Sequence, residues 1–178
     1  MLFKSAKNTG KGYVIPFKKP LHYKLKVKCP FGVDVESDWK WSAKFLINMD
    51  DDDHYEFLED MQIVEKEIEK YIKMQYPTSH ENIFVMQSFL PIEKEKDNPD
   101  GTHCYFRAKI PVKNGLSSTT FTGNGYMETK RRLTSDELNH NSTVIIDIEC
   151  DSWWIITNDK SDNKSVGYTF IINEMKLA

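Results

Sequence analysis

Hydrophobic and polar residues alternate strictly in several short segments, which is the pattern of half-buried β-strands. In residues 21–28, LHYKLKVK, apolar side chains alternate with polar ones, so that one face carries Lys24, Lys26 and Lys28. In residues 39–47, WKWSAKFLI, the apolar positions again fall on one face, and Lys40 and Lys44 fall on the other. Both segments therefore predict strands whose exposed face is basic.

A third alternating segment, residues 103–112, has Tyr105, Arg107 and Lys109 on the face opposite its apolar side chains. Shorter apolar runs, bounded by polar or glycine-containing turns, predict the remaining strands. These runs are residues 83–90, 119–122, 144–150, 153–156 and 168–175. A short capped turn or helix is predicted at 134–138.

Residues 52–76 change to the helical period, with apolar side chains at spacings of three and four between acidic and basic ones. Strands lie on both sides of this helix in the chain, without the regular strand–helix alternation of a parallel sheet. The predicted fold is mostly β (α+β): a small antiparallel OB-fold-like barrel with one long amphipathic helix inserted at about 52–76. Its 178 residues are expected to form a single domain, 1–178.

Charge is unevenly distributed along the chain. Residues 1–33 carry eight lysines and no acidic residue, so the rest has 24 − 8 = 16 basic residues against 27 acidic ones. For the basic N-terminal arm, residues 1–19, two interpretations stay open: a flexible, solvated tail or a contact for an anionic partner. Three widely spaced cysteines favour a reducing compartment. No apolar stretch suggests a membrane span or a secretion signal, so the protein is expected to be intracellular and not secreted.

The run Asp50 to Asp53, followed at once by His54, suggests a metal site. It also joins a predicted strand to the start of the predicted helix, where an aspartate is a good N-cap and carboxylates are favoured by the helix dipole. We prefer the helix-start interpretation and keep a metal-dependent nuclease using Asp50–His54 as the alternative. The chain has no zinc-ligand spacing and no phosphate-binding loop, so we predict no metal, no cofactor, no catalytic residues and no enzyme activity.

The remaining signal is typical of nucleic-acid binding, which combines cations for phosphates with aromatic rings for bases. Basic side chains face outward on three predicted strands, and Tyr105 shares a face with two of them. A further basic cluster follows Tyr126 in a loop. We take Trp39 and Trp41 as core residues, and we expect one of Trp153 and Trp154 to face inward. The predicted nucleic-acid-binding residues are Lys24, Lys26, Lys28, Lys40, Lys44, Tyr105, Arg107, Lys109, Tyr126, Lys130, Arg131 and Arg132.

The order of these elements resembles the single-stranded DNA-binding proteins of phages and large DNA viruses. The resemblance rests on WKWSAKFLINMDDDDHYEFLEDMQIVEKEIEKYI, on KIP at 109–111, on TFTGNGYM, and on the closing segments NSTVIIDIECDSWWIITN and SVGYTFIINEM. It covers roughly residues 20–176 and is one of layout more than of an invariant motif. It implies an oligonucleotide-binding fold, sequence-independent binding of single-stranded DNA, and a viral role in replication, recombination or repair.

The resemblance also implies a homodimer and replication or recombination proteins as partners, in a host cytoplasm, nucleus or viral factory. RNA binding stays open. The chain departs from phage members at its end, since NEMKLA is not an acidic tail. Contacts made by such a tail are therefore not expected here. A third interpretation is a structural or protein-interaction module whose lysines only maintain solubility.

Overall fold

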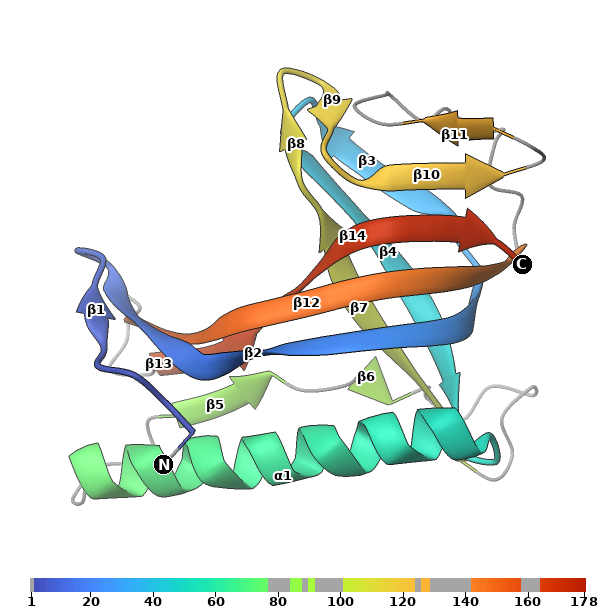
Figure 1. Cartoon of the computed structure of the whole chain (residues 1–178). Helices are drawn as coiled ribbons and strands as arrows, with labels where there is room; N and C mark the ends of the chain where they lie inside the picture. Colours follow the sequence, from blue (N-terminus) through green and yellow to red (C-terminus); the bar gives the residue numbers. More distant parts are fainter. Residues whose placement is uncertain are drawn as a thin grey trace. The chain divides into compact units, whose positions relative to one another are not determined.

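The computed structural model describes residues 2–76, 84–87, 90–91, 101–123, 126–128, 142–157 and 164–178. These residues consist mostly of β-strands, with one helix, α1 (Figure 1). The elements are β1 Lys7–Asn8, β2 Gly12–Cys29, β3 Val33–Ser37, β4 Lys40–Asn48, α1 Asp52–Gln75, β5 Phe84–Gln87, β6 Leu90–Pro91, β7 His103–Ile110, β8 Val112–Lys113, β9 Leu116–Ser117, β10 Thr120–Gly123, β11 Tyr126–Glu128, β12 Ser142–Thr157, β13 Lys164–Tyr168 and β14 Phe170–Leu177.

The central strands form a ring. β14, β7, β4, β2 and β12 follow one another as hydrogen-bonded neighbours, and β12 also pairs with β14. The prediction of an antiparallel sheet is wrong for β14, which runs parallel to both β7 and β10. A parallel pair needs a long crossover connection, and the segment of more than fifty residues between β7 and β14 supplies one.

The chain divides into two compact units, each made of three segments. The first contains Met1–Leu21, Tyr55–Ser88 and Cys150–Tyr168. In it, the buried side of α1 carries six apolar residues of the predicted helical period, whereas Tyr71, which shares that period, is half-buried. The six are Phe57, Leu58, Met61, Val64, Ile68 and Ile72. β13 pairs with β12 in antiparallel fashion and with β5 in parallel. α1 ends at Gln75, one residue before the predicted end, so the predicted amphipathic helix is confirmed.

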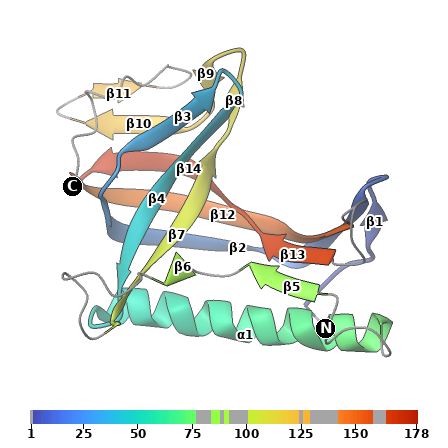
Figure 2. The same ribbon diagram turned by 180° about the vertical axis from the view of Figure 1, so that it is seen from behind.

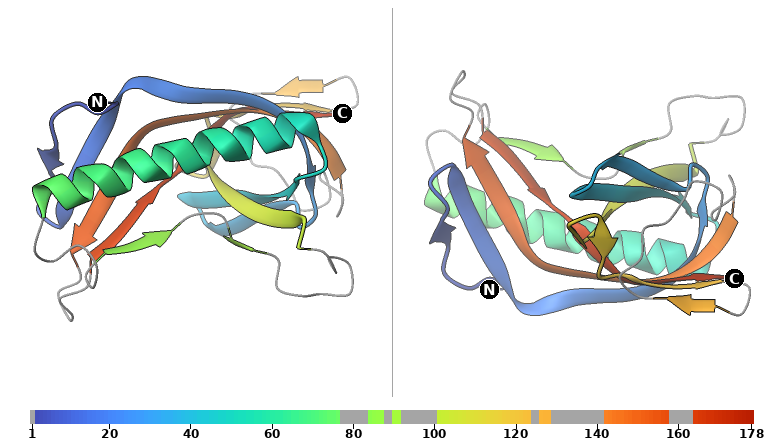
Figure 3. Two further views of the ribbon diagram at one scale, coloured as in Figure 1. Left: turned by 90° about the horizontal axis from the view of Figure 1, so that it is seen from below. Right: turned by 90° about the horizontal axis from the view of Figure 1, so that it is seen from above.

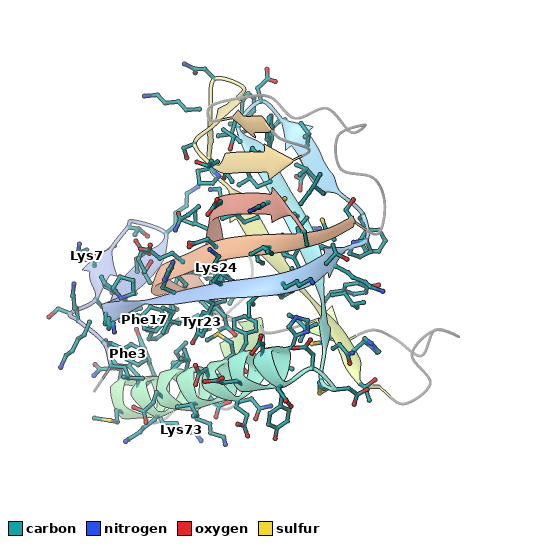
Figure 4. All side chains as sticks on the ribbon, turned by 45° about the vertical axis from the view of Figure 1, so that its right-hand side comes forward. Phe3, Lys7, Phe17, Tyr23, Lys24 and Lys73 are labelled. Atoms are coloured by element: carbon teal, nitrogen blue, oxygen red, sulfur yellow. The ribbon has the colours of Figure 1, made fainter. Side chains whose placement is uncertain are left out.

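An aromatic cluster fills the core of this first unit. The ring of Phe3 lies 5.5 Å from that of Trp153 and 5.8 Å from that of Tyr71, centroid to centroid. Phe17 is 5.6 Å from Phe3, and Figure 4 shows these two side chains together. Trp153 is fully buried, so it is the tryptophan of the pair 153/154 that faces inward.

The N-terminal segment is held beside β2 by backbone hydrogen bonds. The amide of Lys4 donates to the carbonyl of Pro16 at 2.8 Å, and the amide of Lys18 donates to that of Leu2 at 2.8 Å. β1 pairs with the first part of β2, as both panels of Figure 3 show. A side chain at Gly12 would collide with the carbonyl oxygen of Ile155. Residues 12–19 are thus part of a strand that is longer than the predicted one.

The second unit contains His22–His54, Phe89–Glu149 and Thr169–Ala178. β4 and β7 pair over eight residues, from Trp41 opposite Ile110 to Asn48 opposite His103. Their inward side chains, which include the fully buried Trp41 and Phe45, build its core. The alternation predicted for β7 is confirmed, because Cys104, Phe106, Ala108 and Ile110 are buried.

Two other sequence predictions need correction. The alternation places Trp39 in the core with Trp41, but 73% of its surface is exposed because it lies in the turn between β3 and β4. The segments 144–150 and 153–156 are one strand, β12, with a register shift between Asp147 and Ile148. The predicted turn or helix at 134–138 lies outside the described residues.

Candidate nucleic-acid interface

β4 and β7 lie side by side (Figure 2), and their pairing brings four of the predicted site residues onto one outward face. Lys44 lies directly opposite Arg107, and Lys109 lies opposite Ser42. Tyr105 lies opposite Leu46, one pair further along the same face. The alternate pairs, such as Phe45 with Phe106, point into the core. Strand alternation and register therefore place these cations and the tyrosine side by side.

Lys28 joins this face from β2, because it pairs with Leu46, the residue that also faces Tyr105. The side chain of Lys28 is exposed. Lys24 and Lys26 share its side of β2 and are also exposed, but they lie further along the strand (Figure 4 labels Lys24). The register thus connects one of the three β2 lysines directly to the face formed by β4 and β7.

Phe31 completes the face and was not predicted. It lies just after β2, is 56% exposed, and its ring centroid is 5.7 Å from that of Tyr105. The Nζ atom of Lys44 lies 6.0 Å from the centroid of the Phe31 ring, at the edge of cation–π range. We name Lys28, Phe31, Lys44, Tyr105, Arg107 and Lys109 the basic–aromatic face.

The acidic residue Glu36 lies close to two of the basic side chains. A carboxylate oxygen of Glu36 lies 2.6 Å from Lys40 Nζ, and the other lies 3.8 Å from Arg107 Nη1. Both contacts are solvent-exposed, where an ion pair contributes little. A phosphate can therefore replace Glu36 as the partner of Arg107 at a small cost in free energy. Lys40 lies closer to the Glu36 carboxylate than Arg107 does and is therefore less available to a phosphate.

Four predicted site residues cannot be assigned to this face. Tyr126 begins β11, whose backbone pairs with β10, but its side chain lies outside the description. Lys130, Arg131 and Arg132 lie outside the described residues altogether.

The aspartate run starts the helix, as the preferred interpretation predicted. The Oδ1 atom of Asp51 accepts hydrogen bonds from the amides of Asp53 at 3.1 Å and His54 at 3.2 Å. These are the second and third residues of the first turn, so Asp51 is the N-cap.

Both ring nitrogens of His54 have backbone partners. Nδ1 accepts a hydrogen bond from the amide of Asn48 at 3.1 Å, so Nε2 carries the proton and donates to the carbonyl of Lys26 at 2.8 Å. The imidazole thus ties the helix start to β2 and β4. In this arrangement neither nitrogen offers a lone pair to a metal, and the described residues contain no group of three potential metal ligands.

Two buried thiols lie on strands of the second unit, Cys29 at the end of β2 and Cys104 in β7. Burial raises the pKa of Cys29 to about 11, although a hydrogen bond with the backbone of Gly32 opposes the shift. Burial also raises the pKa of Cys104 to about 11. Both groups are therefore protonated at neutral pH and behave as small apolar core residues.

Within the described ranges, no helix has the length and apolar character needed to cross a membrane. No protein-family model matches the sequence, and no curated protein matches it.

Solved structures do show likeness. One is gp2.5, a single-stranded DNA-binding protein encoded by bacteriophage T7, with a TM-score of 0.53 and 11% identity over 89% of this chain and 86% of that one. Another is the single-stranded DNA-binding protein from bacteriophage Enc34 in complex with single-stranded DNA, with a TM-score of 0.48 and 14% identity over 97% and 93% of the two chains. The likeness to gp2.5 is one of fold.

Proposed function

We propose that this chain binds single-stranded DNA through the basic–aromatic face, without catalysis and with little dependence on base sequence. The observation that carries the proposal is the ring pair of the exposed Phe31 and the half-buried Tyr105, 5.7 Å apart, directly beside Lys44 and Arg107. Unpaired bases stack on such rings whatever their identity, while the cations neutralise phosphates. A duplex hides its base faces and cannot use the rings.

The fold supports the same proposal. The closed ring of five strands fits the oligonucleotide-binding barrel, whose strands and loops bind extended single strands. The fold is shared with gp2.5, which is itself a single-stranded DNA-binding protein. We infer from this a viral protein acting in replication, recombination or repair. Homodimer formation, protein partners and the single-domain organisation stay predictions.

The proposal is tested by fluorescence anisotropy with labelled oligo-dT, the matching RNA and a duplex, at salt concentrations from about 50 to about 200 mM. We expect the single strand to bind more tightly than the duplex, with affinity falling as salt rises. Equal affinity for duplex and single strand, or binding unaffected by salt, would refute the proposal. No binding at all would favour the structural or interaction module. Cleavage of labelled DNA with magnesium or manganese, lost in Asp52→Asn, would favour the nuclease.

A further inference from the structure

The turn between β3 and β4 exposes Trp39 to an extent that folding does not explain. Trp39 is 73% exposed, more than any other large hydrophobic residue of the described chain. Tight turns favour glycine, proline, asparagine, aspartate and serine, whereas tryptophan normally stabilises a protein through the large area it buries. Trp39 stabilises the fold very little in this position. A ligand that covers the indole would explain why a tryptophan stands in this turn.

This turn is held in place. The amide of Gly115 donates to the carbonyl of Asp38 at 2.9 Å, which links the turn to the hairpin of β8 and β9 (Figure 2). Asn114 and Gly115 both have positive φ, at 54° and 72°, as in a tight two-residue hairpin turn. On the other side, the indole Nε1 of Trp41 donates to the carbonyl of Ser37 at 3.0 Å. Presenting Trp39 to a ligand therefore needs little additional ordering.

The turn that carries Trp39 lies at the end of β4 that is far from Phe31. Along β4, Leu46 is level with Tyr105, Lys44 with Arg107, and Ser42 with Lys109. Lys40 follows, next to Trp39. At about 3.3 Å per residue, the six steps from Leu46 to Lys40 span about 20 Å. Cations thus connect an aromatic pair at one end with a single tryptophan at the other.

The charge around the turn also suits a polyanion. Near Trp39, Lys40, Lys109 and Lys113 are exposed, and Arg107 and Lys44 follow along the sheet. The acidic side chains on β3 and its turn are Asp34, Glu36 and Asp38, and Glu36 already lies beside two cations. Five basic residues against three acidic ones leave the region positive.

We propose that Trp39 is a second base-stacking position, which engages a single strand long enough to run from the Phe31–Tyr105 pair along Lys44, Arg107 and Lys109. This rests on the proposed function and adds the direction and extent of the bound strand. A short oligonucleotide occupies one end only. A longer one stacks at both ends and gains affinity from the second contact.

The test compares wild type, Trp39→Leu and Trp39→Phe with oligo-dT of lengths from about 4 to about 16 nucleotides, the range of site sizes for such folds. Leucine keeps an apolar side chain but cannot stack, and phenylalanine keeps stacking. We expect Trp39→Leu to weaken binding of the longest oligonucleotide by about 5- to 150-fold, from the usual contribution of one stacked base. The shortest should bind as before, and Trp39→Phe should retain most of the affinity.

Tryptophan fluorescence gives a separate readout. Trp41 and Trp153 are fully buried and Trp154 is half-buried, so Trp39 is the indole most open to contact with a base. Long oligo-dT should quench the wild-type emission, and Trp39→Phe should lose this quenching while still binding. Thermal unfolding of each variant checks the fold.

The outcomes separate the two proposals. If wild type does not bind single strands, the proposed function fails. If wild type binds but Trp39→Leu binds equally well at every length, Trp39 takes no part and this inference alone fails; an exposed tryptophan with no DNA contact would then point to a protein partner. Equal loss at every length would also overturn it, because Trp39 would not be a separate position.

Discussion

The salt dependence of binding should fall when cations of the basic–aromatic face are removed. For single strands, the logarithm of affinity falls with the logarithm of salt concentration at a slope of about −0.7 per neutralised phosphate. If each of Lys28, Lys44, Arg107 and Lys109 contacts one phosphate, this face contributes a slope of about −2.8. The double variant Lys44→Ala/Arg107→Ala should lose about half of it, leaving about −1.4.

These slopes translate into a simple measurement. Between about 50 and about 200 mM salt, the face's contribution weakens binding about 50-fold in wild type and about 7-fold in the double variant. Cations elsewhere add equally to both proteins, so the difference in slope is the tested quantity. The assay is anisotropy of a labelled oligo-dT of about 16 nucleotides, titrated at four salt concentrations.

The matched control removes two cations from α1, Lys66→Ala/Lys73→Ala, both exposed. Its slope should equal that of wild type. An unchanged slope in Lys44→Ala/Arg107→Ala, or an equal decrease in the control, would mean that phosphates do not lie on this face.

Three further predictions concern the fold. Asp51→Ala removes the N-cap acceptor of α1 and should lower the free energy of unfolding by about 1 kcal/mol in urea titration, while Asp50→Ala changes it little. Burial, followed by repulsion from Glu69, raises the pKa of Glu65 despite the 2.7 Å hydrogen bond from the Tyr168 hydroxyl. The native state then binds this proton more tightly than the unfolded state, so the free energy of unfolding falls as pH rises from the ordinary glutamate pKa to the raised one. Glu65→Gln still accepts that hydrogen bond and does not titrate, so its free energy of unfolding should rise relative to wild type over this pH range. A difference between the two proteins that does not change with pH would contradict this prediction. Cys29 and Cys104, with pKa values raised to about 11, should react slowly with iodoacetamide at pH 8 and rapidly in urea, and equal rates would contradict their burial.

The strands of the basic–aromatic face could be predicted because their alternation is local. Apolar residues at every second position of β7 place Tyr105, Arg107 and Lys109 outward whatever the strand pairs with. Phe31 could not be found in this way. Its role depends on the turn after β2 bringing its ring beside Tyr105, a residue more than seventy positions later in the chain. No short-range pattern encodes that distance.

For Trp39, the sequence pattern predicts burial that the structure does not show. Its position continues the alternation of β4, so the pattern extends one residue too far into a turn that no glycine or proline marks. Similarly, Asp151 and Ser152 resemble a break, yet β12 continues through them. Pairing with other strands decides where a strand ends, and pairing is not a property of the segment itself.

The proposed binding depends on stacking of unpaired bases on the rings of the basic–aromatic face, Phe31 and Tyr105. Phe31→Ala tests it most directly, because it removes an exposed ring without opening the core. Affinity for oligo-dT should fall by about 5- to 150-fold in this variant, and Phe31→Trp should restore it. Tyr55→Ala, which removes a comparably exposed ring from α1, should have no effect. Unchanged affinity in Phe31→Ala, with the wild type binding normally, would show that bases do not stack on this face.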